Sequence, residues 1–507
     1  MKSYPTICLS AALLVCSSSF AGQFDKIAEY VEKAKTVFDY PSGTSIAVVK
    51  GDKIIYQGSF GYANIEKQIK ATNQTSYYIA SSTKPFFALA ALLKEHQGAL
   101  SENTSMASLF PKISFDQIDA GKVTVKHLLT HTMGFDNIPL VWATAYAGVH
   151  DYDSRRKMIA KSKPEEEQAL GKYEYSNVGY NTLSVWFDQQ YPHGWQQELK
   201  QTVFSPLKMN HTSAKMSDTN QPGWSIAQPY SFFSDVKNQQ LYLSKQDNTM
   251  HSAGGMVATA PDIARFVIAQ LNEGKVDGKQ VFPASVIKKS QQLQVNMEQS
   301  YGDYERFGYA WGWNLNRYKN QVLHSHFGGF SGTAAHISYM LEKDIGVVIL
   351  NNDDALYSNK AVSGFIASAI YDILLNDEQH TKEQVAKFDQ KHAGEFDKIV
   401  SKFDNISQRI AQHMQQLAAR KWQLTLPKKD YTGVYRHPLI GEIKVTLDDK
   451  NQFHASWGNM HAIATPYKTP DAFRVELAPG QGRPLKFNLV DNKIESVVFD
   501  SMVFSRR

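Results

Sequence analysis

The sequence predicts an α+β fold in one large domain, followed by a small all-β domain. Three observations support this. Apolar runs broken by turn residues predict β-hairpins over residues 45–57 and 332–350, near the two ends of the large domain. Apolar residues at helical spacing predict amphipathic helices over 24–38 and 396–417. Short alternating strands with turn residues then fill 431–504. The chain has 507 residues, more than one hydrophobic core usually holds, so two domains are expected.

The first 21 residues are expected to be a secretory signal peptide. Lys2 gives a short basic start, residues 7–16 are apolar, and residues 19–21 form a small-residue cleavage site. The apolar stretch is too short to span a membrane, and no later stretch reaches the required ~18 residues. A lipoprotein modified at Cys16 is the alternative, which the bulky Val15 before it disfavours. We therefore expect a periplasmic or secreted protein.

Composition excludes some classes of function. The chain is 42% hydrophobic and 12% aromatic, which is typical of a globular protein and not of a disordered one. Its 54 basic and 49 acidic residues give a formal charge of only +5, without a dense basic run, so nucleic-acid binding has no support. Both cysteines, Cys8 and Cys16, lie in the expected signal peptide. The mature protein would therefore have no disulfide and no catalytic thiol.

The elements follow in order along the mature chain. A helix is expected first, because Phe24 and the apolar residues up to Phe38 recur at three- and four-residue spacing. The large domain is expected over 22–377. A long helical connector should cover 378–426, because its apolar residues repeat at helical spacing among lysine, glutamine and aspartate. Pro427 ends this connector. The all-β domain should then occupy 427–507, with strands at 441–447, 453–457, 473–477 and 485–489.

The strongest chemical signal is a serine with a lysine three residues later, Ser81 and Lys84. On a helix these positions share a face, so the lysine amine can reach the serine hydroxyl. A serine hydroxyl is a weak nucleophile until a base takes its proton, and a buried lysine with a lowered pKa can be that base. The same spacing also occurs at Ser154, Ser205, Ser234 and Ser285. Only Ser81 combines an apolar approach, a following helical run and two further motifs downstream.

Those two motifs are Tyr175-Ser176-Asn177 and His326-Phe327-Gly328. With Ser81, they give the chain a resemblance to the β-lactamase-related serine hydrolases, which include class C β-lactamases, DD-peptidases, D-amino-acid peptidases and esterases. Segments 123–135, 204–209 and 252–266 are similar to further patterns of that family, and the likeness runs over about 45–374. Residues 431–441 resemble the lipocalin-like C-terminal domain of some of its members.

The resemblance implies a β-lactamase/transpeptidase-like fold and a role for each site residue. In this fold the N- and C-terminal segments form one antiparallel sheet flanked by helices, the middle of the chain forms a helical lobe, and the active site lies between them. Ser81 would be the acylated nucleophile. Lys84 and Tyr175 would move the protons, and which of them is the base stays open. Asn177 would hold Lys84 and the substrate carbonyl.

His326, Gly328 and Gly329 complete the expected site. The backbone N–H groups of Ser81 and Gly329 would form the oxyanion hole. Gly328 and Gly329 would leave room for the substrate backbone along the strand edge. His326 stands where β-lactamases carry a lysine, and a histidine at neutral pH is mostly uncharged. Phe327 replaces a common threonine, which also removes a carboxylate-binding hydroxyl.

These departures favour a peptidase or esterase that cleaves an amide or ester of a small-molecule or peptide substrate. A β-lactamase is one alternative. The other is a penicillin-binding or sensor protein that is acylated without turnover. No cofactor is expected, and no metal, because neither the His127/His131 pair nor the His324/His326 pair has a carboxylate to complete a site. The C-terminal domain is expected to shape the substrate entrance or to mediate oligomer formation.

Overall fold

The computed structural model describes residues 18–507 except 166–168, 232–237, 302–303, 355–361 and 376–381. The predicted signal peptide lies largely outside the described residues, and its expected cleavage site falls in the first turn of helix α1 (Ser18–Val37). Phe24, Ile27, Val31 and Ala34 of this helix are buried, and so is Phe38 directly after it, as the helical spacing predicted. Within the described part of the chain, no helix is both long and apolar enough to cross a membrane.

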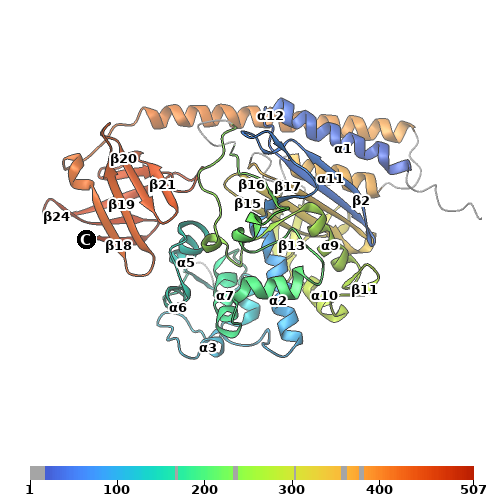
Figure 1. Cartoon of the computed structure of the whole chain (residues 1–507), viewed down its shortest axis with the longest axis horizontal. Coiled ribbons are helices and arrows are strands. Elements are labelled where there is room, and N and C mark those ends of the chain that lie inside the picture. The colour runs from blue at the N-terminus through green and yellow to red at the C-terminus, as the bar shows by residue number, and fades with distance from the viewer. Residues whose placement is uncertain (1–17, 166–168, 232–237, 302–303, 355–361, 376–381) are drawn as a thin grey trace, which may run out of the picture.

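An eight-stranded antiparallel sheet forms the centre of the large domain (Figure 1). Its strands, in spatial order, are β12 (Val295–Tyr301), β13 (Tyr304–Tyr309), β14 (Asn314–Tyr318), β15 (Gln321–Phe330), β16 (Thr333–Met340), β17 (Ile345–Asn351), β1 (Thr44–Lys50) and β2 (Lys53–Phe60). Strand β1 pairs with β17, with Ile46 opposite Ile349. The two predicted hairpins, far apart in sequence, are therefore neighbours in one sheet.

Side chains alternate between the two faces of this sheet, as the pleat of a strand requires. Ile46 and Val48 of β1 pack with α1 and α11 (Val362–Leu375) on one face. Ala47 and Val49 pack on the other face, where α9 (Ala260–Leu271) contacts β1 and β17. Both faces are buried, which explains why β1 and β17 are almost continuous apolar runs.

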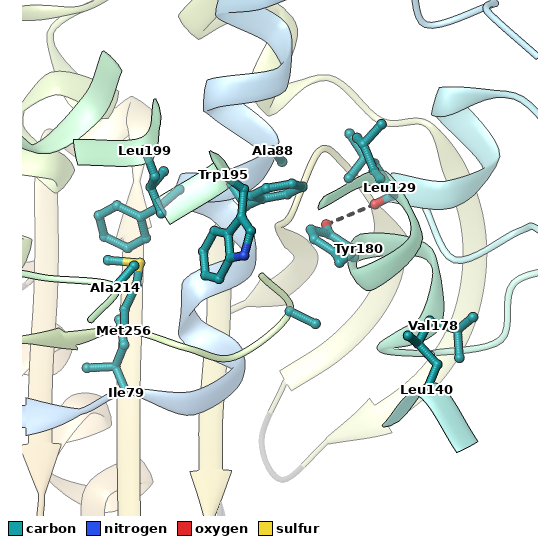
Figure 2. Packing of buried hydrophobic residues seen from close by; sticks show 14 of the residues in the cluster. Ile79, Ala88, Leu129, Leu140, Val178, Tyr180, Trp195, Leu199, Ala214 and Met256 are labelled. Carbon is teal, nitrogen blue, oxygen red and sulfur yellow. Dashed lines mark hydrogen bonds between the residues drawn. The ribbon is translucent and has the colours of Figure 1, made fainter. Parts of the chain in front are cut away.

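A helical lobe packs against the second face of the sheet. Its central helix is α2 (Lys84–His96), whose residues are buried from Lys84 to Lys94. Around it lie α4 (Val125–Leu129), α5 (Ile138–Trp142), α7 (Val178–Gln190), α8 (Gly194–Leu199) and α10 (Ala284–Gln291). Figure 2 shows Trp195 and Tyr180 in this core, and the Tyr180 hydroxyl donates to the Leu129 carbonyl at 2.9 Å. This packing fixes the position of α7, and with it the position of Asn177, which directly precedes the helix.

Helix α12 (Lys382–Ala418) runs along α1 and leads to the C-terminal domain (Figure 1). The rings of Phe38 and Phe403 stack at 4.0 Å between the two helices. The C-terminal domain is one nine-stranded antiparallel sheet, in the order β21 (Met460–Ile463), β20 (Phe453–Trp457), β19 (Gly441–Leu447), β18 (Gly433–His437), β26 (Met502–Arg506), β25 (Lys493–Phe499), β24 (Arg483–Val490), β23 (Ala472–Val475) and β22 (Thr465–Pro466).

The sheet of the C-terminal domain is nearly closed into a barrel. Its two edge strands, β21 and β22, are consecutive in sequence, and between them the Ala464 N–H donates to the Phe453 carbonyl at 2.8 Å. Aromatic rings fill the interior, with Phe453 and Phe473 only 4.3 Å apart. This architecture confirms the predicted lipocalin-like all-β domain.

The barrel packs against the large domain near the end of β15. The Trp142 indole donates to the Asp500 carboxylate at 2.7 Å, and the Ser331 hydroxyl donates to the Pro479 carbonyl at 2.8 Å. Gly458 has a φ of 55°, and a Cβ there would lie 2.1 Å from the Ala147 carbonyl oxygen. The two domains therefore meet through close backbone contact at Gly458 and Ala147, and through a side-chain hydrogen bond from Ser331, the residue that follows β15.

Candidate active site

Ser81 lies on a tight turn between a short strand and helix α2. The strand β5 (Thr75–Tyr78) leads into a single 3-10 turn, Ala80–Thr83, which continues directly into α2. Ala80 has a φ of 46°, a left-handed conformation that is unfavourable for a residue with a Cβ. This turn places Ser81 in a partly exposed position, although its neighbours Ala80 and Ser82 are buried. The local strain is therefore stored at the residue that precedes the predicted nucleophile.

Lys84 is the centre of the site. Its Nζ atom lies 3.2 Å from Ser81 Oγ, 2.7 Å from Asn177 Oδ1 and 2.8 Å from the Ala253 carbonyl oxygen. The side chain is fully buried, and this burial holds the pKa of Lys84 well below its ordinary value. A neutral amine has two N–H donors, which satisfy the two carbonyl oxygens. The lone pair of that neutral form would face the Ser81 hydroxyl, which is the arrangement of a general base and a nucleophile.

Asn177 and Ala253 come from two other parts of the chain. Asn177 directly precedes α7, and Ala253 lies in the loop before β9 (Val257–Ala258). The side chain of Asn177 reaches Lys84 as predicted, whereas the Ala253 carbonyl was not predicted as a ligand. The resemblance had marked the segment 252–266, so a signal was present there. A backbone acceptor has no residue type that would identify it in a sequence.

Tyr175 lies beside Lys84 and faces solvent. Lys84 Nζ is 4.7 Å from the centroid of the Tyr175 ring, and the Tyr175 side chain is 41% exposed. The Tyr175 ring also lies 4.5 Å from the His131 ring and 6.3 Å from the His326 ring. This position suits a group that passes a proton between the site and a departing molecule.

His131 supports the Tyr175-Ser176-Asn177 segment, a role that the sequence did not reveal. The Ser176 backbone N–H donates to His131 Nδ1 at 3.1 Å. Because that nitrogen accepts, the neutral ring carries its proton on Nε2, which lies 3.1 Å from the Tyr309 hydroxyl. Burial, and then the charge of Lys84, hold the pKa of His131 well below its ordinary value. The neutral imidazole thus fixes the turn that carries two site residues.

The histidine pairs have separate partners. His127 Nδ1 accepts the Thr124 N–H at 3.1 Å at the start of α4, away from the contacts of His131. His324 lies with its ring stacked on Tyr339 at 4.8 Å and its Nε2 3.3 Å from the Gln291 carbonyl oxygen. Among the residues that the structure describes, no three histidine, cysteine or acidic side chains form a group that could hold a metal ion.

Strand β15 forms the other wall of the site. The His326 carbonyl accepts the Ser82 hydroxyl at 3.2 Å, which ties the strand to the turn of Ser81. The His326 ring is buried, and burial first, then the charge of Lys84, holds its pKa well below the ordinary value. Its Nδ1 lies 3.0 Å from the Phe327 carbonyl oxygen and is therefore the protonated nitrogen. An uncharged His326 agrees with the sequence-based expectation.

Gly328 has a different role from the one we expected. A Cβ at this position would lie 1.9 Å from the Ile79 carbonyl oxygen and 3.0 Å from the Ser82 nitrogen. The space that the missing side chain leaves is thus filled by the turn of Ser81, and not left for a substrate. Gly329 is partly exposed and pairs with Ala334. Strand β14 pairs with β15 only up to Ser325, so it does not cover the end of β15 that contains both glycines.

Phe327 has little bearing on the site. Its ring stacks on the Tyr301 ring at 5.3 Å and lies tilted, 4.8 Å from the His336 ring. It therefore packs with the core on the α1 and α11 face of the sheet, while His326 faces Ser81. We expected Phe327 to remove a hydroxyl that could bind a substrate carboxylate. The side chain points away from the site, so this expectation is not supported.

Most of the chain is similar to known proteins. The beta-lactamase family model matches residues 35–366. The Flp protein of Staphylococcus aureus (strain N315) is 25% identical over 352 residues, which cover 67% of this chain and 64% of that protein. Penicillin-binding protein 4* of Bacillus subtilis (strain 168) is 24% identical over 361 residues, 66% of this chain and 74% of that protein. The chain thus spans less than two thirds of the Flp protein.

Solved structures give the same fold. An octameric penicillin-binding protein homologue from Pyrococcus abyssi superimposes with a TM-score of 0.58 at 19% identity, over 95% of this chain and 99% of that one. SurE superimposes with a TM-score of 0.55 at 15% identity, over 96% of this chain and 100% of that one. The predicted fold, a β-lactamase/transpeptidase-like domain followed by an all-β barrel, is confirmed. With a family model that matches most of its length, the chain belongs to the beta-lactamase family.

Proposed function

We propose that this protein is a serine hydrolase that cleaves an amide or ester bond through a Ser81 acyl-enzyme, and that it acts as a peptidase or esterase. The contact between Lys84 Nζ and Ser81 Oγ carries this proposal. A buried amine with a lowered pKa, held by two carbonyl oxygens and aimed at a partly exposed serine, is arranged to accept a proton.

The reaction follows from these contacts. Ser81 Oγ attacks the carbonyl carbon while its proton passes to Lys84 Nζ, and the backbone N–H groups of Ser81 and Gly329 stabilise the oxyanion. The leaving amine or alcohol then departs with a proton supplied from the Tyr175 side of the site. Water attacks the acyl-enzyme in the second half and releases the acid. The direct contact favours Lys84 as the base and leaves Tyr175 as the proton shuttle.

A β-lactamase is the less favoured alternative. A lysine at the position of His326 would attract the carboxylate of a β-lactam, whereas the buried imidazole is held neutral. Kinetics on a D-Ala-D-Ala peptide, a short-chain nitrophenyl ester and a chromogenic cephalosporin separate these activities. If the cephalosporin were the substrate turned over fastest, β-lactamase would become the favoured activity.

A labelling experiment tests the nucleophile. The protein is incubated with a fluorescent serine-reactive phosphonate and, separately, a fluorescent penicillin, and the adduct mass is followed over time. Ser81→Ala should abolish labelling. Ser285→Ala is the matched control, because Ser285 has the same spacing to a lysine but lies exposed at the start of α10. Labelling that survives Ser81→Ala would refute the assignment.

The same experiment addresses the alternative of a binding or sensor protein. Such a protein would be acylated at Ser81 but would not release the acid. A penicillin adduct that persists for many hours while no ester or peptide is turned over would support this alternative. An adduct that forms and decays supports the hydrolase.

Location and assembly remain proposals. We propose a periplasmic or secreted enzyme on the basis of the leader-like first 21 residues. We also propose that the protein forms oligomers through its C-terminal barrel, with the octameric homologue from Pyrococcus abyssi as precedent for assembly within this fold. Light scattering of the full mature chain, and of a chain without residues 427–507, tests this.

A further inference from the structure

A second buried lysine lies near the site and takes no part in the proposed chemistry. Lys245 is only 9% exposed, and burial holds its pKa well below the ordinary value. Its Nζ donates to the Ala145 carbonyl at 2.6 Å and lies 3.6 Å from the centroid of the Phe330 ring. Among the described residues it has no ion pair with a carboxylate. Burying an amine without a counter-ion costs free energy, so its position requires a reason.

Lys245 lines a cavity of about 380 Å³, a volume that falls within the range of small-ligand sites. The cavity walls include Tyr78, Trp224 and Phe330, and the lining also includes the polar residues Gln228 and Thr333. Among the described residues that line the cavity, Lys245 is the cationic group and none is acidic. The cavity therefore combines aromatic walls and uncharged polar side chains with a positive anchor.

This cavity adjoins the nucleophile. Tyr78 and Phe330, which line it, pack in one cluster with Ala80, the residue before Ser81. His251, also buried, is near enough to both buried lysines to be affected by their charges. Burial is the main cause of its lowered pKa, and the charges of both Lys245 and Lys84 lower it further. The residues that line the cavity therefore also pack against the turn that carries Ser81.

The direction of β15 indicates which part of a substrate reaches the cavity. In the middle of the strand His326 lies near Tyr175, the group proposed to protonate the leaving group, with the two rings 6.3 Å apart. At the end of the strand Phe330 covers Lys245. If the leaving group lies near Tyr175, the acyl group extends the opposite way, past Gly329 and towards Lys245.

We propose that this cavity binds the acyl portion of the substrate, and that Lys245 recognises a carboxylate on that portion. The inference rests on the proposed hydrolase function and names its substrate class: acyl groups that end in a carboxylate. The carboxylate supplies the counter-ion that Lys245 otherwise lacks. The carbonyl of Ala145 and the face of Phe330 hold the lysine in place before the substrate binds.

Two esters with one leaving group test the proposal. The mono-4-nitrophenyl ester of glutaric acid and 4-nitrophenyl pentanoate both carry a five-carbon acyl chain, and only the first ends in a carboxylate. Hydrolysis by Ser81→Ala is subtracted as background. The wild type should prefer the glutarate by about tenfold or more in kcat/KM, the size expected for a hydrogen bond to a charged group.

Lys245→Met should abolish this preference, mainly by raising KM for the glutarate, and should leave kcat/KM for the pentanoate within about threefold, because binding of an uncharged chain does not use the amine. Lys35→Met is the matched control, since Lys35 is a buried lysine, 8% exposed, on the opposite face of the sheet. It should keep the preference. An equal loss on both esters would show a structural role for Lys245 and overturn the proposal. A wild type without preference would also overturn it, whatever the variant does.

Binding separates this proposal from the proposed function. If neither ester shows Ser81-dependent hydrolysis, the hydrolase assignment fails, and calorimetry on Ser81→Ala then tests the cavity alone. Glutaric acid monoanilide should bind at least about tenfold more tightly than pentananilide, and the added Lys245→Met should remove the difference. Equal binding of the two anilides would refute recognition of a carboxylate by Lys245.

Discussion

Replacing Gly328 with alanine tests how the sheet positions the nucleophile. The added Cβ would lie 1.9 Å from the Ile79 carbonyl oxygen. This is roughly 1.5 Å short of an ordinary van der Waals contact, and the obstacle is backbone, which cannot rotate away. Strand β15 and the turn of Ser81 must therefore separate by about that distance. The Gly329 N–H would then no longer lie at its native distance from Ser81.

The expected loss follows from that displacement. A misplacement of about 1 Å at a catalytic centre can cost about 100-fold in rate, which corresponds to about 2.7 kcal/mol of transition-state stabilisation. Overpacking should also lower the free energy of unfolding by about 1–3 kcal/mol. Phosphonate labelling under pseudo-first-order conditions measures the first effect, and urea unfolding followed by circular dichroism measures the second.

Gly394→Ala is the matched control, because the Cβ position of Gly394 on α12 has no neighbour within 4 Å. It should label at the wild-type rate. The reasoning would be refuted if folded Gly328→Ala also labelled at the wild-type rate. The close contact of β15 with the Ser81 turn would then have no part in catalysis.

Two further predictions concern protonation. Asn177→Asp places a carboxylate where Oδ1 now lies 2.7 Å from Lys84 Nζ; the opposite charge should raise the pKa of Lys84 by about one to three units. The pH at half-maximal labelling should rise equally, and an unchanged profile would contradict Lys84 as the base. Burial lowers the pKa of His324 to about 4, whereas the pKa of an unfolded histidine is about 6.5. Between these two pH values the unfolded state binds the proton more readily, so the free energy of unfolding falls as the pH drops from about 6.5 to about 4. His324→Phe should reduce the loss of unfolding free energy between pH 7.5 and 4.5, measured in urea, by about 2.5 kcal/mol; an equal loss in both proteins would argue against it.

Local patterns were sufficient to predict most elements. The predicted strands 441–447 and 453–457 coincide with β19 and β20. The apolar spacing from Phe24 lies on α1 up to Ala34, with Phe38 directly after the helix, and the connector pattern lies on the single helix α12. Each of these features depends on periodicity within one segment, and that information is present in the sequence itself.

The parts of the site that could not be predicted depend on backbone groups and distant contacts. The Ala253 carbonyl that binds Lys84, and the Ile79 carbonyl that fills the space at Gly328, belong to residues whose side chains take no part. Likewise, Phe327 and His326 are adjacent in sequence but face opposite sides of the sheet. The expected role of Phe327 failed because it was judged from the motif without the register of β15.

The base strength of Lys84 is itself a product of the tertiary structure. The Ser81 turn, the Asn177 segment and the Ala253 loop are separated by at least 75 residues in sequence, and together they exclude water from one amine. Burial lowers the pKa of that amine, while the two carbonyl oxygens hold its Nζ atom 3.2 Å from Ser81 Oγ. The serine–lysine spacing alone provides proximity but not reactivity. This explains why four other serines with the same spacing give no reason to expect a nucleophile, and why a substitution such as Asn177→Asp should alter the chemistry without touching the serine.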